Sequence, residues 1–409
     1  MEKSQQNNKQ WQSAGTYLIK LLWYALHDQQ PEKKPEECTW QQVWMLAKRN
    51  NVECTVSAAI DRVPEEMPEK IRKSWKEARK RNLYRQVCFD MEKERITMKM
   101  AECGIASLPL KGILVSGYYP APGMRWMCDN DILYGYIEPE SDSGFKLKGD
   151  GLSEQEYWQG QAQKKLCEIM KKQGYMVESL KGSHDVYHKK PFFNFEMHKR
   201  LVSEDSKFAV YYMNPWKRAI PIEGSPLQFR FSDEDEYLFL IAHAYKHFDA
   251  SGCGIRTLVD EYVILQTKKK LDWEYINREL EQIGLTDFEK KLRNTAIHAF
   301  GENIQLHKDD WQIIFYMLGC GTYGTSANRI RRELKKLEET NAESVKQRYL
   351  KERFWIDEKR MKEFFPFFYR HSKLRLILPL YRLVKGLLVH PRYLMDEWKV
   401  LKQYISKKE

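Results

Sequence analysis

Three segments with different hydrophobic patterns follow one another along the 409-residue chain. From residue 11 to about 104, apolar residues recur at intervals of three and four, as in 40–48 and 87–100, which predicts amphipathic helices. Residues 105–230 contain short apolar runs bounded by turn residues, which predict strands. From Ser232 onward the pattern is almost wholly helical. We therefore expect a helical region (1–104), an α/β core (105–230) and a second helical region with a basic tail (231–409).

The middle segment predicts the sheet. Its expected strands are residues 105–110, 128–137, 175–180, 184–188 and 192–198. A brief helix should run from Gly112 to about Tyr119, where Pro120 to Gly123 break it. A polar stretch at 138–154 should form an exposed, mobile loop, and 155–172 should be helical. The fold class that follows is α/β, of the α+β kind, with a small mixed sheet between helical flanks.

Two acidic residues head one of the predicted strands. Because side chains alternate faces in a strand, Asp129 and Asp131 should point the same way, with Cα atoms about 6.6 Å apart. Two carboxylates at this spacing suit hard divalent cations, and two magnesium ions can clamp the oxygens of a phosphoryl transfer. Two acids at positions i and i+2 of a strand more often belong to a solvent-exposed face than to a metal site. The Lys111-Gly112 turn and Arg125 upstream favour the functional interpretation.

The order of these motifs resembles the uncharacterised nucleotidyltransferase family, a branch of the DNA polymerase beta-like nucleotidyltransferase superfamily. The resemblance covers most of the chain. It rests on Leu110-Lys111-Gly112, Tyr119 to Arg125, Asp129-Asn130-Asp131, Phe195-Glu196-Met197-His198, His243 to His247, Arg256 with Asp260, and the segment 365–382.

The resemblance implies a polymerase-beta-like core and a two-metal mechanism. Asp129 and Asp131 would hold Mg²⁺, with Mn²⁺ as the alternative ion, and Glu196 would be the third carboxylate and could accept the acceptor's proton. A nucleoside triphosphate such as ATP would be attacked at its α-phosphorus, and pyrophosphate would leave. Gly112 would let the backbone approach the phosphates, while Lys111 and Arg125 would neutralise their charge.

Three positions depart from the superfamily pattern. Ile113 follows Gly112, so the turn offers no serine hydroxyl to a phosphate. Asn130 stands where an apolar residue is common, which suggests a less buried back face for that strand. Glu196 is one methylene longer than Asp, which leaves the metal geometry open.

A helix beginning at Ser232 should carry further polar groups. Ser232 and Asp235 form a candidate capping box, and Leu238, Ile241, Ala242 and Tyr245 form a core stripe. His243, Lys246 and His247 cluster on its flank, either to bind the triphosphate or as an ordinary polar face. Arg256 and Asp260 are most simply an intrahelical ion pair, and His198 either orients Glu196 or bonds within the fold.

The formal net charge of +11 suits an anionic partner, and +7 of it lies between Arg370 and Glu409. The apolar and basic residues of 373–388 suit an anionic membrane or a nucleic-acid backbone, but a packed terminal helix is the preferred interpretation. The eight cysteines are scattered without metal-site spacing. The sequence begins without a signal peptide and has no spanning apolar run, so we expect a cytoplasmic protein.

The function expected from these features is metal-dependent transfer of a nucleoside monophosphate from an NTP to an acceptor. The acceptor stays open between a small molecule, a protein side chain and an RNA end. The alternative is a non-catalytic protein that keeps the fold and binds nucleotide or a partner. A third hypothesis, an RNA-binding module, lacks paired stacking aromatics on adjacent strands.

Overall fold

A computed structural model describes residues 2–140, 144–339, 345–389 and 391–405. Packing divides the chain into two units. The core unit comprises residues 1–245 and 255–318, and the C-terminal unit comprises residues 246–254 and 319–409. The three-part division expected from the sequence stays a prediction.

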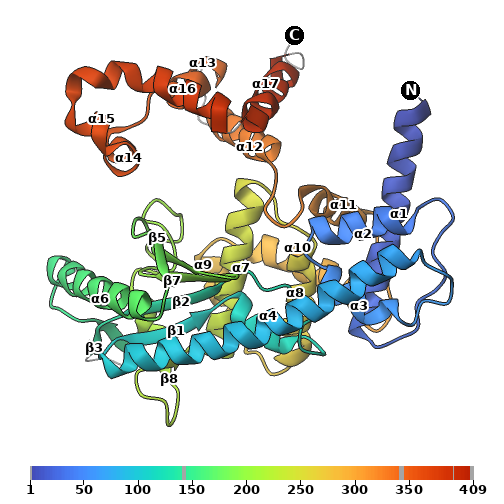
Figure 1. The fold of residues 1–409 in the computed structure, drawn as a ribbon, viewed down its shortest axis with the longest axis horizontal. Helices are drawn as coiled ribbons and strands as arrows, with labels where there is room; N and C mark the ends of the chain where they lie inside the picture. Colours follow the sequence, from blue (N-terminus) through green and yellow to red (C-terminus); the bar gives the residue numbers. More distant parts are fainter. Residues whose placement is uncertain (1, 141–143, 340–344, 390, 406–409) are drawn as a thin grey trace. The chain divides into compact units, whose positions relative to one another are not determined.

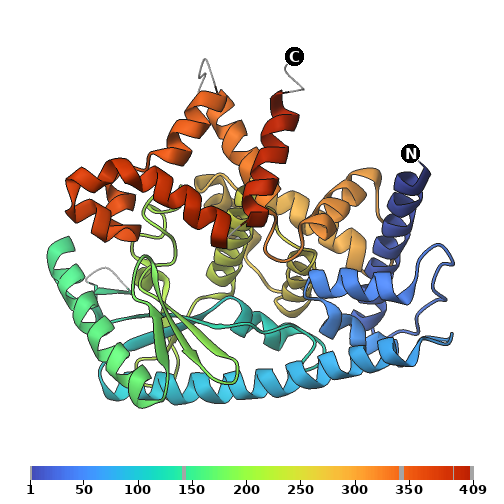
Figure 2. The same ribbon diagram turned by 45° about the horizontal axis from the view of Figure 1, so that its top comes forward.

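The core unit begins with four helices, as the periodicity of residues 11–104 predicts (Figure 1). They are α1 (Glu2–Leu26), α2 (Trp40–Arg49), α3 (Glu53–Ile60) and α4 (Glu69–Glu102). Thr39 and Gln42 form a capping box at the start of α2. Helix α4 is the long one and runs beside the strands along much of the core unit (Figure 2). It therefore contacts both the N-terminal helices and the sheet.

Five strands of the described chain form one mixed sheet in the order β1-β2-β7-β6-β5. Their bounds are β1 (Ala106–Leu110), β2 (Asn130–Gly135), β5 (Met176–Ser179), β6 (His184–Lys189) and β7 (Phe193–His198). Strands β2 and β7 are parallel, and the other neighbours are antiparallel. Between β1 and β2 lie α5 (Gly112–Val115) and a 3-10 turn, η1 (Ser116–Tyr118). The mixed α/β class expected from the sequence is confirmed.

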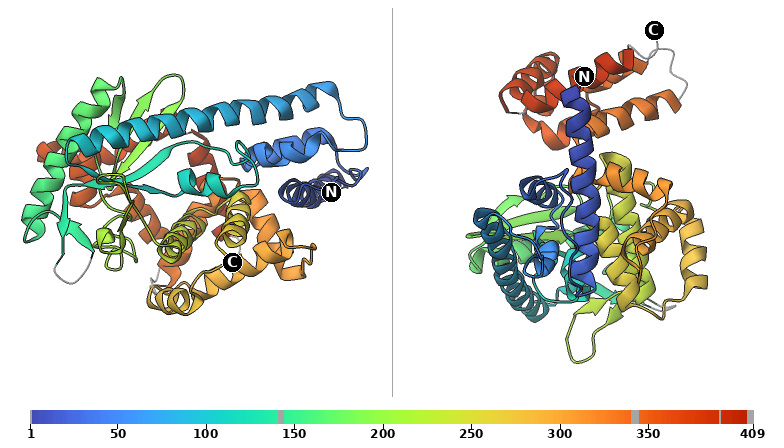
Figure 3. Two further views of the ribbon diagram at one scale, coloured as in Figure 1. Left: turned by 90° about the horizontal axis from the view of Figure 1, so that it is seen from below. Right: turned by 90° about the vertical axis from the view of Figure 1, so that its right-hand side faces the viewer.

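One face of the sheet packs on helices. Helix α6 (Leu152–Lys172) and α4 cover the face that carries Ile132, Phe195 and Met197, and these residues share one buried cluster. Figure 3 shows α4 and α6 beside the strands of the core unit. Because side chains alternate along a strand, Asp131, Glu196 and His198 belong to the opposite face. That face carries the candidate site.

Two local expectations are wrong. The stretch 138–154 was expected to be a loop, but β3 (Ile137–Pro139) and β4 (Phe145–Leu147) pair within it as an antiparallel hairpin. Residues 141–143 at its tip lie outside the described residues. Asn130 was expected to leave its strand less buried, yet it is fully buried and its amide donates to the carbonyl oxygen of Phe89 on α4 at 3.1 Å.

The remaining core helices follow two short strands, β8 (Ile220–Pro221) and β9 (Phe229–Arg230), and the turn η2 (Pro215–Arg218). They are α7 (Asp233–Ala250), α8 (Arg256–Thr267), α9 (Trp273–Gln282), α10 (Thr286–Phe300) and α11 (Lys308–Cys320). One bond of the predicted capping box of α7 is present, because the Asp235 amide donates to Ser232 Oγ at 3.0 Å. No helix in the described ranges is long and apolar enough to cross a membrane.

The C-terminal unit is helical, as its periodicity predicts. It contains α12 (Ser326–Glu339), α13 (Val345–Phe354), α14 (Glu358–Phe364), α15 (Pro366–Arg370), η3 (Ser372–Ile377), α16 (Leu378–Val389) and α17 (Pro391–Ile405). Ile330, Leu334, Tyr349 and Val400 form its small core. The expectation that 373–388 is a packed terminal helix is wrong for most of its aliphatic side chains, which are exposed.

A buried chain of polar groups joins three helices of the core unit. The Tyr237 hydroxyl lies 2.6 Å from Glu261 Oε1 and 2.7 Å from Glu289 Oε1, and Arg293 Nε lies 2.6 Å from Glu289 Oε1. One hydroxyl hydrogen cannot serve both carboxylates. Burial raises the pKa of Glu261 to about 8, so this residue keeps its proton and supplies the second hydrogen.

Stability should therefore depend on pH through Glu261. Its proton is held more tightly in the folded state than in the unfolded state, so this contribution is full below the unfolded pKa. It is lost as pH rises toward the folded value of about 8. Glu261→Gln keeps a hydrogen-bond donor but cannot ionise. Between pH 5 and pH 8 its free energy of unfolding should therefore fall less steeply with pH than that of the wild type, by up to about 1.4 kcal/mol per pH unit. Urea unfolding of this variant and of the exposed control Glu302→Gln measures the slopes; indistinguishable slopes for Glu261→Gln and wild type would contradict the assignment.

Candidate active site

Helix α4 holds the loop between η1 and β2. Asn82 donates through its amide to the carbonyl oxygens of Gly123 and Arg125 at 2.8 and 2.7 Å and accepts from the Met127 amide at 3.1 Å. Gln86 accepts from the Gly123 amide at 2.7 Å. Gly123 has a φ of +80°, and an added Cβ would lie 3.0 Å from the Leu83 backbone. The loop therefore requires glycine here, and residues 123–127 are fixed against α4.

This loop places Arg125 in a buried ion pair with Asp260 of α8. Arg125 Nε and Nη2 donate to the two carboxylate oxygens of Asp260 at 2.8 and 2.9 Å, and the Tyr119 hydroxyl donates to Oδ1 at 2.7 Å. The predicted intrahelical pair of Arg256 with Asp260 is thus wrong. Arg125 is 8% exposed, so its role in this structure is to join the loop to α8. Its predicted contact with phosphate stays a prediction.

Gly112 lies directly against Arg125. An added Cβ at this position would sit 2.6 Å from Arg125 Nη1, a distance that real Cβ atoms do not show. Gly112 was predicted to let the backbone approach the phosphates, and the packing of Arg125 against it also requires a glycine at this position. Ile113 is buried with Phe89 and Met127, which explains an apolar residue where the superfamily pattern has a hydroxyl.

The carboxylates meet where β2 and β7 run side by side. Asp131 is the second residue of β2 and is the register partner of Glu196 on β7. Asp129 precedes the strand by one residue, so the strand starts two residues later than predicted. Asp129 feels the charge of Asp131, and Glu196 feels the charges of both aspartates. The structure thus brings together the three predicted acids.

Lys111 places its ammonium among these acids. Its Nζ lies 2.7 Å from Asp131 Oδ1, and both side chains are largely buried. The backbone of Lys111 has φ +56° and ψ −127°, a conformation that residues with a side chain rarely adopt. Strain of this kind persists where surrounding structure enforces it, and it is frequent at functional sites. Here it turns the side chain from the β1–α5 turn toward β2.

Two histidines complete the site face. His198 Nε2 lies 2.8 Å from Asp131 Oδ1, and His184 on β6 is the register partner of His198. Each histidine places Nε2 3.9 Å from Glu196 Oε2. His198 therefore bonds mainly to Asp131, which favours the second of its two predicted roles. His184 was not predicted as a site residue.

The electrostatics follow from three carboxyl groups beside one ammonium. Burial and the charge of Asp131 raise the pKa of Asp129 to about 6, and burial with the charges of Asp131 and Asp129 raises the pKa of Glu196 to about 7. Burial alone would raise the pKa of Asp131, but Lys111 and His198 hold it well below its usual range. Burial and the Lys111 charge lower the pKa of His198 to about 4, so its ring is neutral.

These donors fit a divalent cation. Carboxylate oxygens are the ligands that Mg²⁺ and Mn²⁺ prefer, and neutral imidazole nitrogens are acceptable to Mn²⁺. The ligand atoms of His184, Glu196 and His198 all lie within 4.8 Å of one another. His298, His307 and Asp310 form a similar group. There the carboxylate already accepts from Thr295, from the His307 amide and from His298, so its role is structural.

The predicted residues on α7 are divided between the two units. His243 belongs to the core unit, where its ring lies 6.3 Å from that of Phe239. Lys246 and His247 belong to the C-terminal unit. Their contact with a triphosphate stays a prediction.

Two features of the site were not predicted from the sequence. His184 is the first residue of the His-x-Val-x-His pattern that predicted its strand. Only the register of β6 on β7 places it opposite His198. The partner of Arg125 lies 135 residues away on a separate helix, and an arginine at i−4 of Asp260 offered a simpler local pairing.

Comparison with known families agrees with this geometry. A family model described as "Uncharacterised nucleotidyltransferase" matches residues 36–136 and 159–301, which together are more than half of the chain. The match includes the whole Lys111-to-Asp131 segment, β6, β7 and the helix that carries Asp260. No curated protein and no solved structure matches the chain. The chain therefore belongs to the uncharacterised nucleotidyltransferase family.

Proposed function

We propose that this protein transfers a nucleoside monophosphate from a nucleoside triphosphate to an acceptor, with a divalent cation, and releases pyrophosphate. The observation that carries the proposal is the meeting of Asp129, Asp131 and Glu196 on one face of β2 and β7 beside the ammonium of Lys111. Three carboxyl groups exceed the single positive charge that Lys111 brings to them. A divalent cation is the ligand that such an excess favours.

Asp129, Asp131 and Glu196 would hold Mg²⁺ or Mn²⁺. When bound, such an ion supplies charge to the phosphate oxygens and lowers the pKa of an acceptor hydroxyl. The fit rests on the donor set and on the crowding of its charges.

The chain's own groups supply the rest of the chemistry. Lys111 neutralises phosphate charge, because its ammonium lies beside the carboxylates. Glu196, the register partner of Asp131, accepts the proton of the acceptor hydroxyl. The acceptor oxygen forms the new bond to the α-phosphorus, and the bond from that phosphorus to the bridging oxygen of pyrophosphate breaks. Acceptor and nucleobase stay open, because the family does not define them.

Metal-dependent nucleotide binding should require the aspartates. Calorimetric titration of the wild type with each NTP should show binding in Mg²⁺ that EDTA removes. Asp129→Asn should lose most of that binding, because the amide keeps the shape of the side chain and removes its charge.

The matched control is Asp150→Asn, which changes an exposed aspartate. Circular dichroism should show that both variants are folded. Equal NTP affinity in EDTA, or in Asp129→Asn, would sink the proposal. Binding without any product, over a panel of hydroxyl acceptors, would favour the non-catalytic alternative.

Two roles of Arg125 can be distinguished by experiment: joining its loop to α8 through Asp260, and binding phosphate directly. Removing one partner of a buried ion pair costs about 3 to 5 kcal/mol. Arg125→Ala and Asp260→Asn should therefore each lower the free energy of unfolding by this order. Both should weaken NTP and NMP binding by similar factors. A selective loss of NTP binding in Arg125→Ala, with Asp260→Asn unaffected, would instead show direct contact with the β- and γ-phosphates.

Lys246 is predicted to bind the triphosphate. If it does, Lys246→Ala should weaken NTP binding about tenfold or more while NMP binding changes little, because charge-assisted bonds to the distal phosphates are lost. Titration with ATP and AMP, in Lys246→Ala and in the exposed control Lys269→Ala, measures this ratio. The same change in both affinities would count against the contact.

A further inference from the structure

Helix α16 of the C-terminal unit exposes a row of aliphatic side chains. Leu380, Leu383, Val384, Leu387 and Leu388 are spaced at i, i+3, i+4, i+7 and i+8, so they share one side of the helix. All five are exposed, with Leu380 61% and Leu388 78% accessible. Leu378 is buried, and Gly386 faces Leu394 of α17. The helix therefore packs on its own unit through another side.

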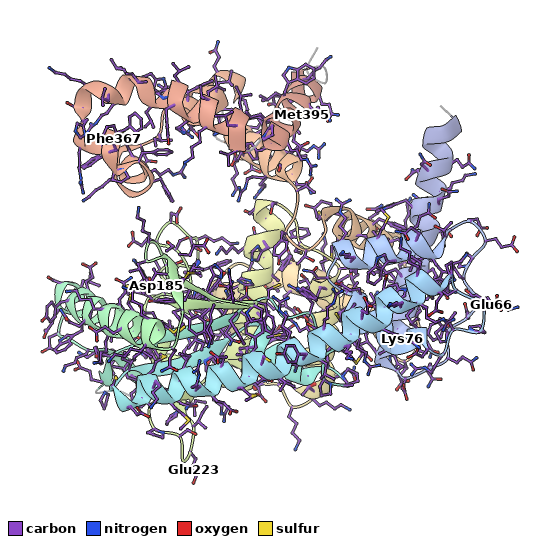
Figure 4. All side chains as sticks on the ribbon, viewed as in Figure 1. Glu66, Lys76, Asp185, Glu223, Phe367 and Met395 are labelled. Carbon is purple, nitrogen blue, oxygen red and sulfur yellow. The ribbon has the colours of Figure 1, made fainter. Side chains whose placement is uncertain are left out.

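The exposed face continues beyond α16. Leu376 and Ile377 of η3 are exposed immediately before the helix, and we call these seven residues the aliphatic face. Tyr381, Met395 and Trp398 are exposed on α16 and α17 in the same unit. Figure 4 labels Met395 and another exposed apolar residue of this unit, Phe367. Folded proteins that stay in water seldom expose a continuous apolar patch of this kind, and such patches mark interaction sites.

The same unit carries the positive charge of the chain. Residues 246–254 and 319–409 contain 23 Lys and Arg against 12 Asp and Glu. Their net charge of +11 equals that of the whole chain, so the core unit is neutral by the same count. Lys373, Lys385, Arg392 and Lys399, which lie near the aliphatic face in the sequence, are all exposed. The partner of this surface must accept both aliphatic side chains and positive charge.

We propose that the C-terminal unit docks on an anionic lipid bilayer, with the aliphatic face inserted at the boundary between headgroups and acyl chains. An amphipathic helix with leucines on one face and lysine and arginine nearby binds anionic membranes in this way. Exposed Tyr381 and Trp398 suit the same boundary, where aromatic rings with a polar edge collect.

The other partners fit less well. A nucleic acid would use the positive charge but has no apolar surface for seven aliphatic side chains. A second copy would bring another unit of charge +11 against the first. The core unit has no net charge to attract a unit of charge +11. The attachment is peripheral, since the described helices include none that could span a bilayer.

The test is sedimentation of the full chain with vesicles of phosphatidylcholine, with and without phosphatidylglycerol. The wild type should bind the anionic vesicles and bind the neutral ones much more weakly. Leu383→Ser/Leu387→Ser should weaken binding to anionic vesicles by about tenfold or more, because two leucines that insert into the bilayer are lost. The control Val210→Ser/Met213→Ser changes two exposed apolar residues of the core unit and should bind as the wild type does.

Both positions in the test variant are exposed, so the variant should fold, and circular dichroism checks this. Leu380→Ser/Leu388→Ser repeats the test on the same face. Failure of the folded wild type to bind anionic vesicles would overturn the proposal. It would also be overturned by binding that both serine variants retain and that salt abolishes, which would show a surface for polyanions alone. Sedimentation velocity without vesicles distinguishes a second copy: a dimer that the serine variants disrupt, without vesicle binding, would assign the face to self-association.

Discussion

The site depends on the ion pair between Lys111 and Asp131. This pair is the point at which the β1–α5 turn, β2 and, through His198, β7 are joined by buried polar contacts. It offsets one negative charge of the group, while Asp129 and Glu196 stay close to Asp131 with their pKa values raised. The folded protein thus holds like charges together at a cost in free energy that binding of the proposed cation would relieve. That cost is the physical link between the fold and the proposed chemistry.

Helix α4 makes this arrangement rigid. Its side chains bond the loop that carries Arg125. The carbonyl oxygen of Phe89 on the same helix accepts a hydrogen bond from the side-chain amide of Asn130, between the two aspartates. Arg125 then bonds Asp260, so α8 is tied to the same loop. The residues expected to touch phosphate and the residues that position them are therefore interleaved in the sequence. A substitution in this segment will often change both stability and binding, which is why paired affinities for NTP and NMP are needed to separate the two.

Much of the fold could be predicted from local sequence patterns. The rest depends on contacts between residues that are far apart in the sequence. The Asp129–Asp131 spacing, the strand of Glu196 and the Ser232 cap are local signals, and the structure places strands and a cap there. The Asp260 partner and the bond from His198 to Asp131 needed the tertiary arrangement, which no single segment encodes. The prediction of a loop at 138–154 failed for another reason, because the polar composition of this stretch hides its two short strands. The aliphatic face of α16 shows that apolar periodicity predicts a helix but not what covers it.

The most direct test of the account concerns the third carboxylate, which the register of β2 and β7 places beside Asp131. Electron paramagnetic resonance of Mn²⁺, titrated into the protein with a non-hydrolysable NTP analogue, counts bound ions and reports their affinity. We expect tight, nucleotide-dependent Mn²⁺ binding in the wild type and a loss of at least one bound ion, or about a tenfold weaker affinity, in Glu196→Gln. Unchanged Mn²⁺ binding in folded Glu196→Gln would contradict it.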